Sequence, residues 1–165
     1  MLKIAPLLLS LFAAFFFTAC NAMLAKMSQN SFSQANSYEN SSVQIKLLNI
    51  QKQWQNTPYR LGGVSVKGAD CSGFIQSVFK EHFQTTIPRT TKTQLQGGKK
   101  VAKNELKSGD ILFFRTGRGP NGLHTGIYLA NDEFIHLSTS GGVKKVSFDS
   151  SYWKPKFIGA RRYLR

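Results

Sequence analysis

Cysteine is scarce in this sequence, and its scarcity narrows the chemistry that the protein can perform. Only Cys20 and Cys71 occur among 165 residues. Structural zinc sites draw on clusters of cysteine and histidine ligands, which two distant cysteines do not provide. The sequence therefore indicates no zinc site, and we expect neither a metal nor another cofactor.

Long hydrophobic runs are also scarce, and the clearest one lies at the N-terminus. Lys3 precedes an almost wholly apolar stretch at residues 4–17, which Pro6 and Ser10 interrupt. This stretch is shorter than the roughly 20 apolar residues that a transmembrane helix needs. A short positive region, an apolar run and then small residues are typical of a secretory signal peptide, so we expect residues 1–20 to direct export.

Cys20 follows Thr18 and Ala19, and small residues before a cysteine resemble a bacterial lipobox. The resemblance implies that Cys20 becomes the lipidated first residue of the mature protein, although Phe17 stands where leucine is usual. Asn21 is typical of lipoproteins sorted to the outer membrane. We therefore expect a protein of the cell envelope that is anchored to the periplasmic face of the outer membrane and does not span it. The alternative is an ordinary signal peptide that leaves Cys20 as a free thiol.

The fate of Cys71 depends on that of Cys20. Two cysteines in an exported chain first suggest a disulfide. Lipidation of Cys20 excludes this pairing and leaves Cys71 as a single thiol. Because a free thiol is a liability in an oxidising compartment unless the protein uses it, we expect Cys71 to be functional.

Acidic residues are few, with 8 Asp and Glu against 22 Lys and Arg, which gives a net charge of +14. A strongly basic chain often binds nucleic acid. The export signal argues against nucleic acid here and leaves cell-wall polymers and lipid head groups as anionic partners. A basic surface without a specific partner is the alternative.

The sequence predicts one folded domain behind the signal peptide. Residues 21–42 are rich in Ser, Asn and Gln and contain few large apolar groups. This composition favours a flexible tether. Residues 43–165 contain no internal repeat and are long enough for one modest core.

Helical spacing dominates the first half of that domain. Val43, Leu47, Ile50 and Trp54 predict an amphipathic helix that ends before Pro58. A second helix is predicted to begin at about Cys71. The stretch after this helix is rich in threonine and is predicted to be a loop.

From residue 109 onward, short β-like segments alternate with turn residues. The predicted strands lie at residues 110–115, 125–130, 133–138, 143–148 and 157–164. Helices followed by a run of strands indicate an α+β fold, in which N-terminal helices pack on an antiparallel sheet of about five strands.

The position of Cys71 favours a nucleophile. It stands where a loop becomes a helix, and the unpaired N–H groups and dipole of a helix N-terminus favour the thiolate. The alternative interpretation is a small buried hydrophobic residue, which is common for free cysteine.

A cysteine nucleophile needs a base and often a third group that orients the base. The chain has three histidines, and His82 lies among charged residues of the second predicted helix, where a structural role is expected. His124 opens a predicted strand and His136 lies in the next one. We expect His124 to be the base and His136 its partner, with two structural histidines as the alternative.

This assignment imposes a condition on the hairpin between the two histidines. A plain two-residue turn at Asn131 and Asp132 would place Ile127 opposite His136 and point His124 to the other face. An odd loop or a β-bulge is needed to bring the two rings to one face, and Gly126 is the predicted bulge position.

Several segments resemble the NlpC family of papain-like cell-wall cysteine peptidases in their combination and order. They are Thr57–Gly63, Asp70–Phe74, Leu106–Asp110, His124–Tyr128, Phe134–Ser140, Tyr152–Lys154 and Ala160–Arg162. The resemblance covers essentially the whole domain from residue 43, and within the family it is strongest to a lipoprotein murein endopeptidase. Residues 97–104 and 116–123 are less typical of the family.

The resemblance implies a catalytic triad of Cys71, His124 and His136, and a papain-like fold. It also implies that Tyr59 stabilises the oxyanion, and that Asp70 and Ser72 contact the substrate.

The implied substrate is a peptidoglycan stem peptide, cut at the D-alanyl–diaminopimelate cross-link. Two alternatives stay open: cleavage of the γ-D-glutamyl–diaminopimelate bond, and a non-catalytic wall-binding lipoprotein. Sequence alone identifies no regulatory protein partner.

Overall fold

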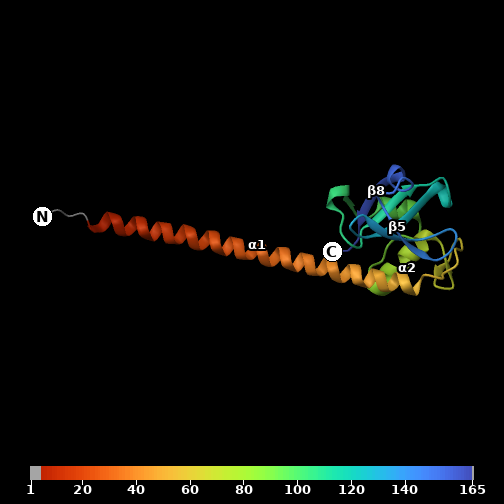
Figure 1. The fold of residues 1–165 in the computed structure, drawn as a ribbon, viewed down its shortest axis with the longest axis horizontal. Helices are drawn as coiled ribbons and strands as arrows, with labels where there is room; N and C mark the ends of the chain where they lie inside the picture. Colours follow the sequence, from red (N-terminus) through yellow and green to blue (C-terminus); the bar gives the residue numbers. More distant parts are fainter. Residues whose placement is uncertain (1–4, 165) are drawn as a thin grey trace. The chain divides into compact units, whose positions relative to one another are not determined.

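The structure is a computed structural model that describes residues 5–164, with side chains described for residues 23–119 and 121–164. The chain divides into two compact units, Met1–Glu39 and Asn40–Arg165. Helix α1 (Ala5–Gln53) contributes its C-terminal part to the second unit. The second unit contains every other helix and strand (Figure 1). Cys20 lies where α1 side chains are not described, so its lipidation stays a prediction.

The structure differs from the predicted tether, because α1 continues through residues 21–42. Every residue from 23 to 39 is exposed. The helical form satisfies the backbone hydrogen-bonding groups without burying side chains, which is how so polar a stretch can be helical. Among the residues that the structure describes, no helix combines the length and the apolar character needed to cross a membrane.

Helix α2 (Cys71–Phe83) begins where the sequence predicted. Its N-cap is Asp70, whose side chain accepts a hydrogen bond from the backbone N–H of Gly73. Its C-cap is Gln84 in the left-handed conformation, with φ of 51°. A third helix, α3 (Thr91–Gln96), occupies the stretch predicted as a loop and is capped by Thr90 in a capping box.

A six-stranded antiparallel sheet forms the centre of the second unit, one strand more than expected. The strand order is β3-β8-β4-β5-β6-β7. The strands are β3 (Lys99–Val101), β4 (Ile111–Arg115), β5 (Leu123–Ala130), β6 (Glu133–Leu137), β7 (Val143–Ser147) and β8 (Phe157–Arg162). A separate hairpin of β1 (Val64–Ser65) and β2 (Gly68–Ala69) precedes α2.

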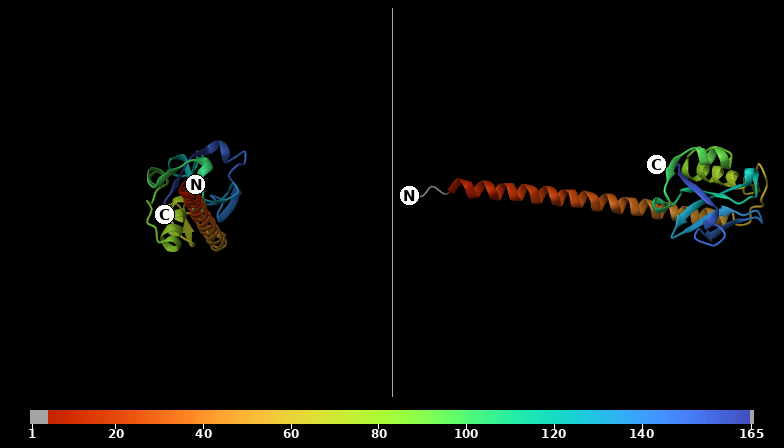
Figure 2. Two further views of the ribbon diagram at one scale, coloured as in Figure 1. Left: turned by 90° about the vertical axis from the view of Figure 1, so that its left-hand side faces the viewer. Right: turned by 90° about the horizontal axis from the view of Figure 1, so that it is seen from above.

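The two faces of the sheet pack against different parts of the chain (Figure 2). One face carries Ile111 and Phe113 of β4 and packs against α2 and the end of α1. The other face carries Leu112 and Phe114 and packs against the segment that links β7 to β8. Because side chains alternate along a strand, burial of four successive residues of β4 means that both of its faces are covered.

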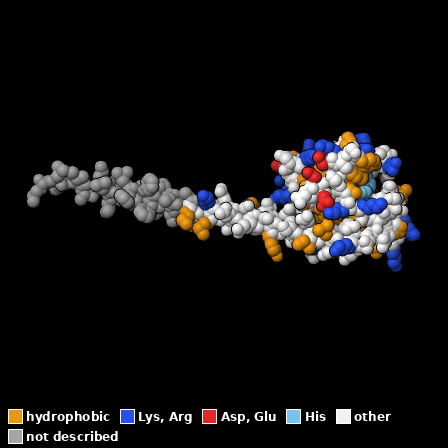
Figure 3. Space-filling view, viewed as in Figure 1, with side chains coloured by type: hydrophobic (Ala, Val, Ile, Leu, Met, Phe, Trp, Pro, Cys, Tyr) orange, Lys and Arg blue, Asp and Glu red, His pale blue; other side chains and the backbone are white. Residues whose placement is uncertain are grey.

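Lysine and arginine side chains are spread over the face of the second unit shown in Figure 3, where acidic side chains are few. This distribution matches the net charge of +14.

Candidate active site

Cys71 is a buried free thiol at the first position of α2. Its Sγ lies 3.7 Å from the hydroxyl oxygen of Thr91, the first residue of α3. Burial raises the pKa of the Cys71 thiol, and the neighbouring Asp70 carboxylate raises it further. The predicted shift toward thiolate is therefore wrong for the free protein, because desolvation outweighs the hydrogen bonds from Thr91, Tyr59 and the backbone of Ser72 that lower the pKa of the thiol.

Tyr59 places its hydroxyl beside this thiol. Its backbone forms an isolated bridge to Ala69, two residues before Cys71. The hydroxyl is buried and makes no hydrogen bond of good geometry among the described residues, but it lies close enough to the Cys71 thiol to lower the pKa of that thiol. Burial raises the pKa of Tyr59, and the proximity of Cys71 raises it further. The structure thus supplies a protonated donor next to the predicted nucleophile.

The carboxylate of Asp70 is held by several donors at once. It accepts hydrogen bonds from the backbone of Gly62 at 2.8 Å and of Gly73 at 2.7 Å, and from Ser72 Oγ at 3.0 Å. Arg89 binds both of its oxygens, at 2.9 and 2.7 Å. Burial alone would raise the pKa of Asp70, but the hydrogen bonds from Arg89, Gly73 and Gly62 outweigh it and lower the pKa.

Arg89 was not among the predicted site residues. It stands in the stretch predicted as a loop, 19 positions from Asp70. Its signal was a lone arginine between Pro88 and Thr90, which alone names no partner. Asp70, Ser72 and Arg89 line a pocket beside the start of α2, together with Gly62 and Thr91. Asp70 and Ser72 both bond to Arg89. Their predicted contacts with the substrate stay predictions.

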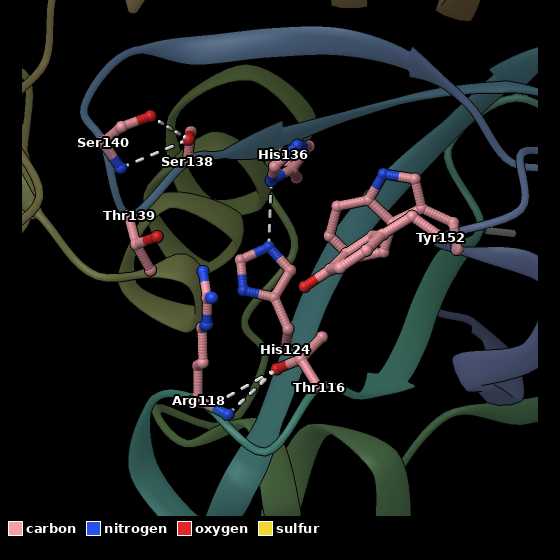
Figure 4. Close-up of a pocket in the computed structure, with 9 residues that line it drawn as sticks. Thr116, Arg118, His124, His136, Ser138, Thr139, Ser140 and Tyr152 are labelled. Atoms are coloured by element: carbon pink, nitrogen blue, oxygen red, sulfur yellow. Dashed lines mark hydrogen bonds between the residues drawn. The ribbon is translucent and has the colours of Figure 1, made fainter.

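His124 and His136 form a buried hydrogen-bonded pair, with His124 Nε2 and His136 Nδ1 2.9 Å apart (Figure 4). Burial, and then the neighbouring His136, lower the pKa of His124 to about 3. Burial likewise lowers the pKa of His136 to about 4. Both rings are therefore neutral at neutral pH.

A β-bulge brings the two rings to one face, as the register argument required. The pairing of β5 with β6 shifts between Tyr128 and Ala130, and Ala130 pairs with Glu133 across a two-residue turn. The predicted bulge position at Gly126 is wrong. Gly126 is needed for space, because a Cβ there would lie 2.6 Å from the Phe134 ring and 2.7 Å from the Ile135 carbonyl oxygen.

Trp153 encloses the histidine pair from the segment between β7 and β8. Its ring stacks on His124 with centroids 5.5 Å apart, and meets His136 edge-on at 4.9 Å. Trp153 was predicted only as part of a family-like segment, without a role of its own. Its indole shields the pair from water, which is part of why both rings are buried and neutral.

A second pocket opens at the histidine pair (Figure 4). Besides the two histidines and Trp153, it is lined by Thr116, Arg118, Ser138, Thr139, Ser140 and Tyr152. Thus the residues that flank Cys71 line one pocket and the histidines line another. No hydrogen bond joins Cys71 to His124 among the side chains that the structure describes. In free enzymes such catalytic contacts are often long and tighten only with substrate.

His82 is partly exposed near the end of α2 and lines neither of these pockets. In the described part of the chain, no group of three or more His, Cys, Asp or Glu side chains is arranged to hold a metal ion.

The chain is similar to several known proteins. The model of the NlpC/P60 family matches residues 56–162. A Haemophilus influenzae protein named as a probable endopeptidase is 50% identical over 112 residues, which cover 68% of this chain and 70% of the relative. The murein DD-endopeptidase and LD-carboxypeptidase MepS of Escherichia coli K12 is 42% identical over 129 residues, covering 78% of this chain and 68% of the relative.

Solved structures agree with the fold. An NlpC/P60 family protein from Bacillus cereus superposes with a TM-score of 0.66 at 32% identity, and the match covers 74% of this chain and 40% of that protein. The NlpC/P60 domain of the peptidoglycan hydrolase SagA gives a TM-score of 0.58 at 27% identity over 72% of this chain and 97% of that domain. The expected papain-like α+β fold is confirmed. By the family match and by these relatives, the chain belongs to the NlpC/P60 family.

Proposed function

We propose that this protein is a peptidoglycan endopeptidase in which Cys71, His124 and His136 form the catalytic triad. The observation that carries the proposal is the 2.9 Å hydrogen bond between the two buried histidines, in a chain whose free thiol begins a helix. Membership of the family and relatives named as endopeptidases support the enzyme class, a cysteine peptidase.

The first step starts from two neutral groups. Sγ of Cys71 attacks the carbonyl carbon of the scissile amide while His124 takes the thiol proton. If His136 accepts at Nδ1, His124 holds its own proton at Nε2, and its Nδ1 is left as the base. The new C–S bond pushes the carbonyl electron pair onto oxygen. The unpaired hydroxyl of Tyr59 and the backbone N–H of Cys71 are the donors that would stabilise this oxyanion.

The second step releases the amine. The imidazolium of His124 donates its Nδ1 proton to the leaving nitrogen as the C–N bond breaks, which leaves a thioester on Cys71. Water then attacks the thioester with His124 again as base, and the thiol is restored. Through both steps His136 fixes the tautomer and orientation of the His124 ring, the role of a third triad member.

The bond proposed for cleavage is the D-alanyl–diaminopimelate cross-link of stem peptides. The name of the Escherichia coli relative, a murein DD-endopeptidase, supports this choice. The γ-D-glutamyl–diaminopimelate bond is the alternative within the same mechanism. A non-catalytic wall-binding role is disfavoured because the thiol, the two histidines and the tyrosine hydroxyl that the mechanism needs are all present.

We also propose that a lipid on Cys20 anchors the protein to the periplasmic face of the outer membrane. The support is the sequence around Cys20 alone. The Cys20→Ala variant should move from the membrane fraction to the soluble periplasmic fraction on cell fractionation. Retention of that variant in the membrane fraction would contradict the anchor and leave the peptidase proposal untouched.

The activity itself is tested with cross-linked muropeptide dimers and mass spectrometry. The purified protein should release monomers, and the Cys71→Ala variant should release none while remaining folded by circular dichroism. Shortened stems with intact cross-links would instead indicate the γ-D-glutamyl–diaminopimelate bond. Cleavage by the Cys71→Ala variant would overturn the mechanism.

A further inference from the structure

The pocket at the histidine pair presents one charged side chain to a ligand. Its described lining residues include no aspartate or glutamate, and Arg118 is the only lysine or arginine among them. Both histidines there are neutral at neutral pH, since their pKa values are lowered to about 3 and about 4. The pocket is therefore suited to an anionic group.

Arg118 is available for such a ligand. It is exposed, and none of the ion pairs between described side chains involves its guanidinium. Figure 4 shows its side chain extending beside the His124 ring toward Thr139, on the side of the ring nitrogen that does not bond to His136. A planar guanidinium binds a carboxylate or a phosphate through two parallel hydrogen bonds, and of these two groups the proposed substrate carries the carboxylate.

The backbone of the loop fixes where Arg118 starts. The N–H groups of Thr116 and Gly117 both donate to the carbonyl oxygen of Gly122, at 3.0 and 3.1 Å. The N–H of Arg118 donates to the Thr116 hydroxyl at 3.3 Å. Gly117 and Gly119 on either side have φ of 72° and 74°, a conformation that suits glycine. The loop thus holds the Arg118 backbone at the rim of the pocket.

The proposed chemistry decides which half of the substrate lies here. The group that protonates the leaving amine must be within hydrogen-bond reach of it, and that group is His124. The leaving half therefore lies in the pocket that His124 lines. In the D-alanyl–diaminopimelate cross-link, the carbon that bears the leaving amine also bears a free carboxylate. In the γ-D-glutamyl–diaminopimelate bond of a longer stem, the corresponding carboxyl group is tied up in the next amide.

We propose that Arg118 determines specificity by binding the free carboxylate next to the leaving amine, and so favours the cross-link over the γ-D-glutamyl bond. This inference rests on the proposed function. Arg118 lies in residues 116–123, where the sequence is less typical of the family.

The test compares two muropeptide dimers that differ only in this carboxylate, one with the free acid and one with the primary amide. The unmodified protein should cleave the acid with a kcat/KM about tenfold higher or more, the effect of one charge-assisted bidentate contact. Arg118→Gln should lose that preference by slowing on the acid alone. Arg118→Lys should keep part of it, because an ammonium retains the charge without the fork.

Arg115→Gln is the matched control, since it removes the same charge from an exposed residue that does not line the pocket. It should keep the preference. An equal loss by Arg118→Gln on both dimers, or no loss, would overturn the inference while the endopeptidase activity stands.

Binding separates this failure from failure of the proposed function. If the unmodified protein cleaves neither dimer, the two dimers are titrated into Cys71→Ala and into Cys71→Ala/Arg118→Gln by calorimetry. Tighter binding of the acid that disappears without Arg118 would support the carboxylate contact even though the proposed activity had failed. Equal binding of acid and amide by Cys71→Ala would refute the contact.

Discussion

At the scale of single residues, burial decides the protonation states in which the predicted catalytic groups rest. The pKa of the Cys71 thiol is raised and that of His124 is lowered, so the stable pair is thiol and imidazole. A thiolate–imidazolium pair would require the opposite shifts. Substrate binding and the oxyanion donors must therefore make proton transfer favourable during attack and not before it.

This resting state predicts the pH dependence of alkylation. Because the pKa of Cys71 lies above its ordinary value, the thiolate fraction should keep rising with pH through the neutral range. The rate of reaction with iodoacetamide, measured from pH 5 to 9 with Cys71→Ala as blank, should rise about tenfold per pH unit. A rate that is already maximal near pH 5 would instead show a preformed ion pair with His124.

Tyr59 offers a separation of activity from stability. Its hydroxyl is buried without a partner, so Tyr59→Phe removes an unsatisfied group and should leave the melting temperature unchanged or slightly higher. Loss of an oxyanion donor should lower kcat by roughly a hundredfold. Thermal melting and steady-state kinetics on muropeptide dimers measure both effects. An unchanged kcat would remove Tyr59 from the oxyanion site.

At the scale of elements, the pairing of β5 with β6 sets the geometry of the histidine pair. Gly126→Ala should destabilise the fold by about 2 kcal/mol, because its Cβ would press on the Phe134 ring and the Ile135 carbonyl oxygen. Urea unfolding followed by fluorescence measures this change. Ser147→Ala, at an exposed position at the end of β7, is the control and should be neutral. If Gly126→Ala left the free energy of unfolding unchanged, the strands could move apart without destabilising the fold.

The elements differ in how far the sequence predicted them. Helix α2 was found because the sequence changes from loop-like to helical at Cys71, whereas its cap, Asp70, was recognised only in the structure. Strand β3 was missed because two of its three residues are exposed lysines, and only its pairing with β8 makes it a strand. The six-residue α3 was missed because a threonine-rich stretch is typical of a loop, and the capping box at Thr90 lies within that stretch.

The candidate site shows the same limit. Cys71, His124 and His136 could be named from residue type and order. The bulge at Tyr128–Ala130 could be required but not located, since a register shift depends on packing of both faces of the sheet. Arg89 was not found because it binds Asp70 across 19 positions through a loop.

At the scale of the whole molecule, the excess of basic residues predicts how the protein meets its substrate. Peptidoglycan carries many carboxylates. A chain of net charge +14, with lysine and arginine side chains spread over the face of the second unit in Figure 3, attracts such a polymer at long range. This attraction is screened beyond roughly 10 Å at 0.1 M salt. Small soluble muropeptides present few charges, so the same effect should be weak for them.

The expected result is a difference between two substrates. Raising sodium chloride from 50 to 500 mM should lower binding of Cys71→Ala to insoluble sacculi several-fold, as a pull-down measures. Over the same range, cleavage of a muropeptide dimer by the unmodified protein should change by less than about twofold, since short-range contacts in the pockets are less screened. Equal salt sensitivity of sacculus binding and dimer cleavage would place the decisive charges inside the site. Arg118 would then be the first residue to replace. Insensitivity of sacculus binding would mean that the basic surface contributes solubility and not substrate capture.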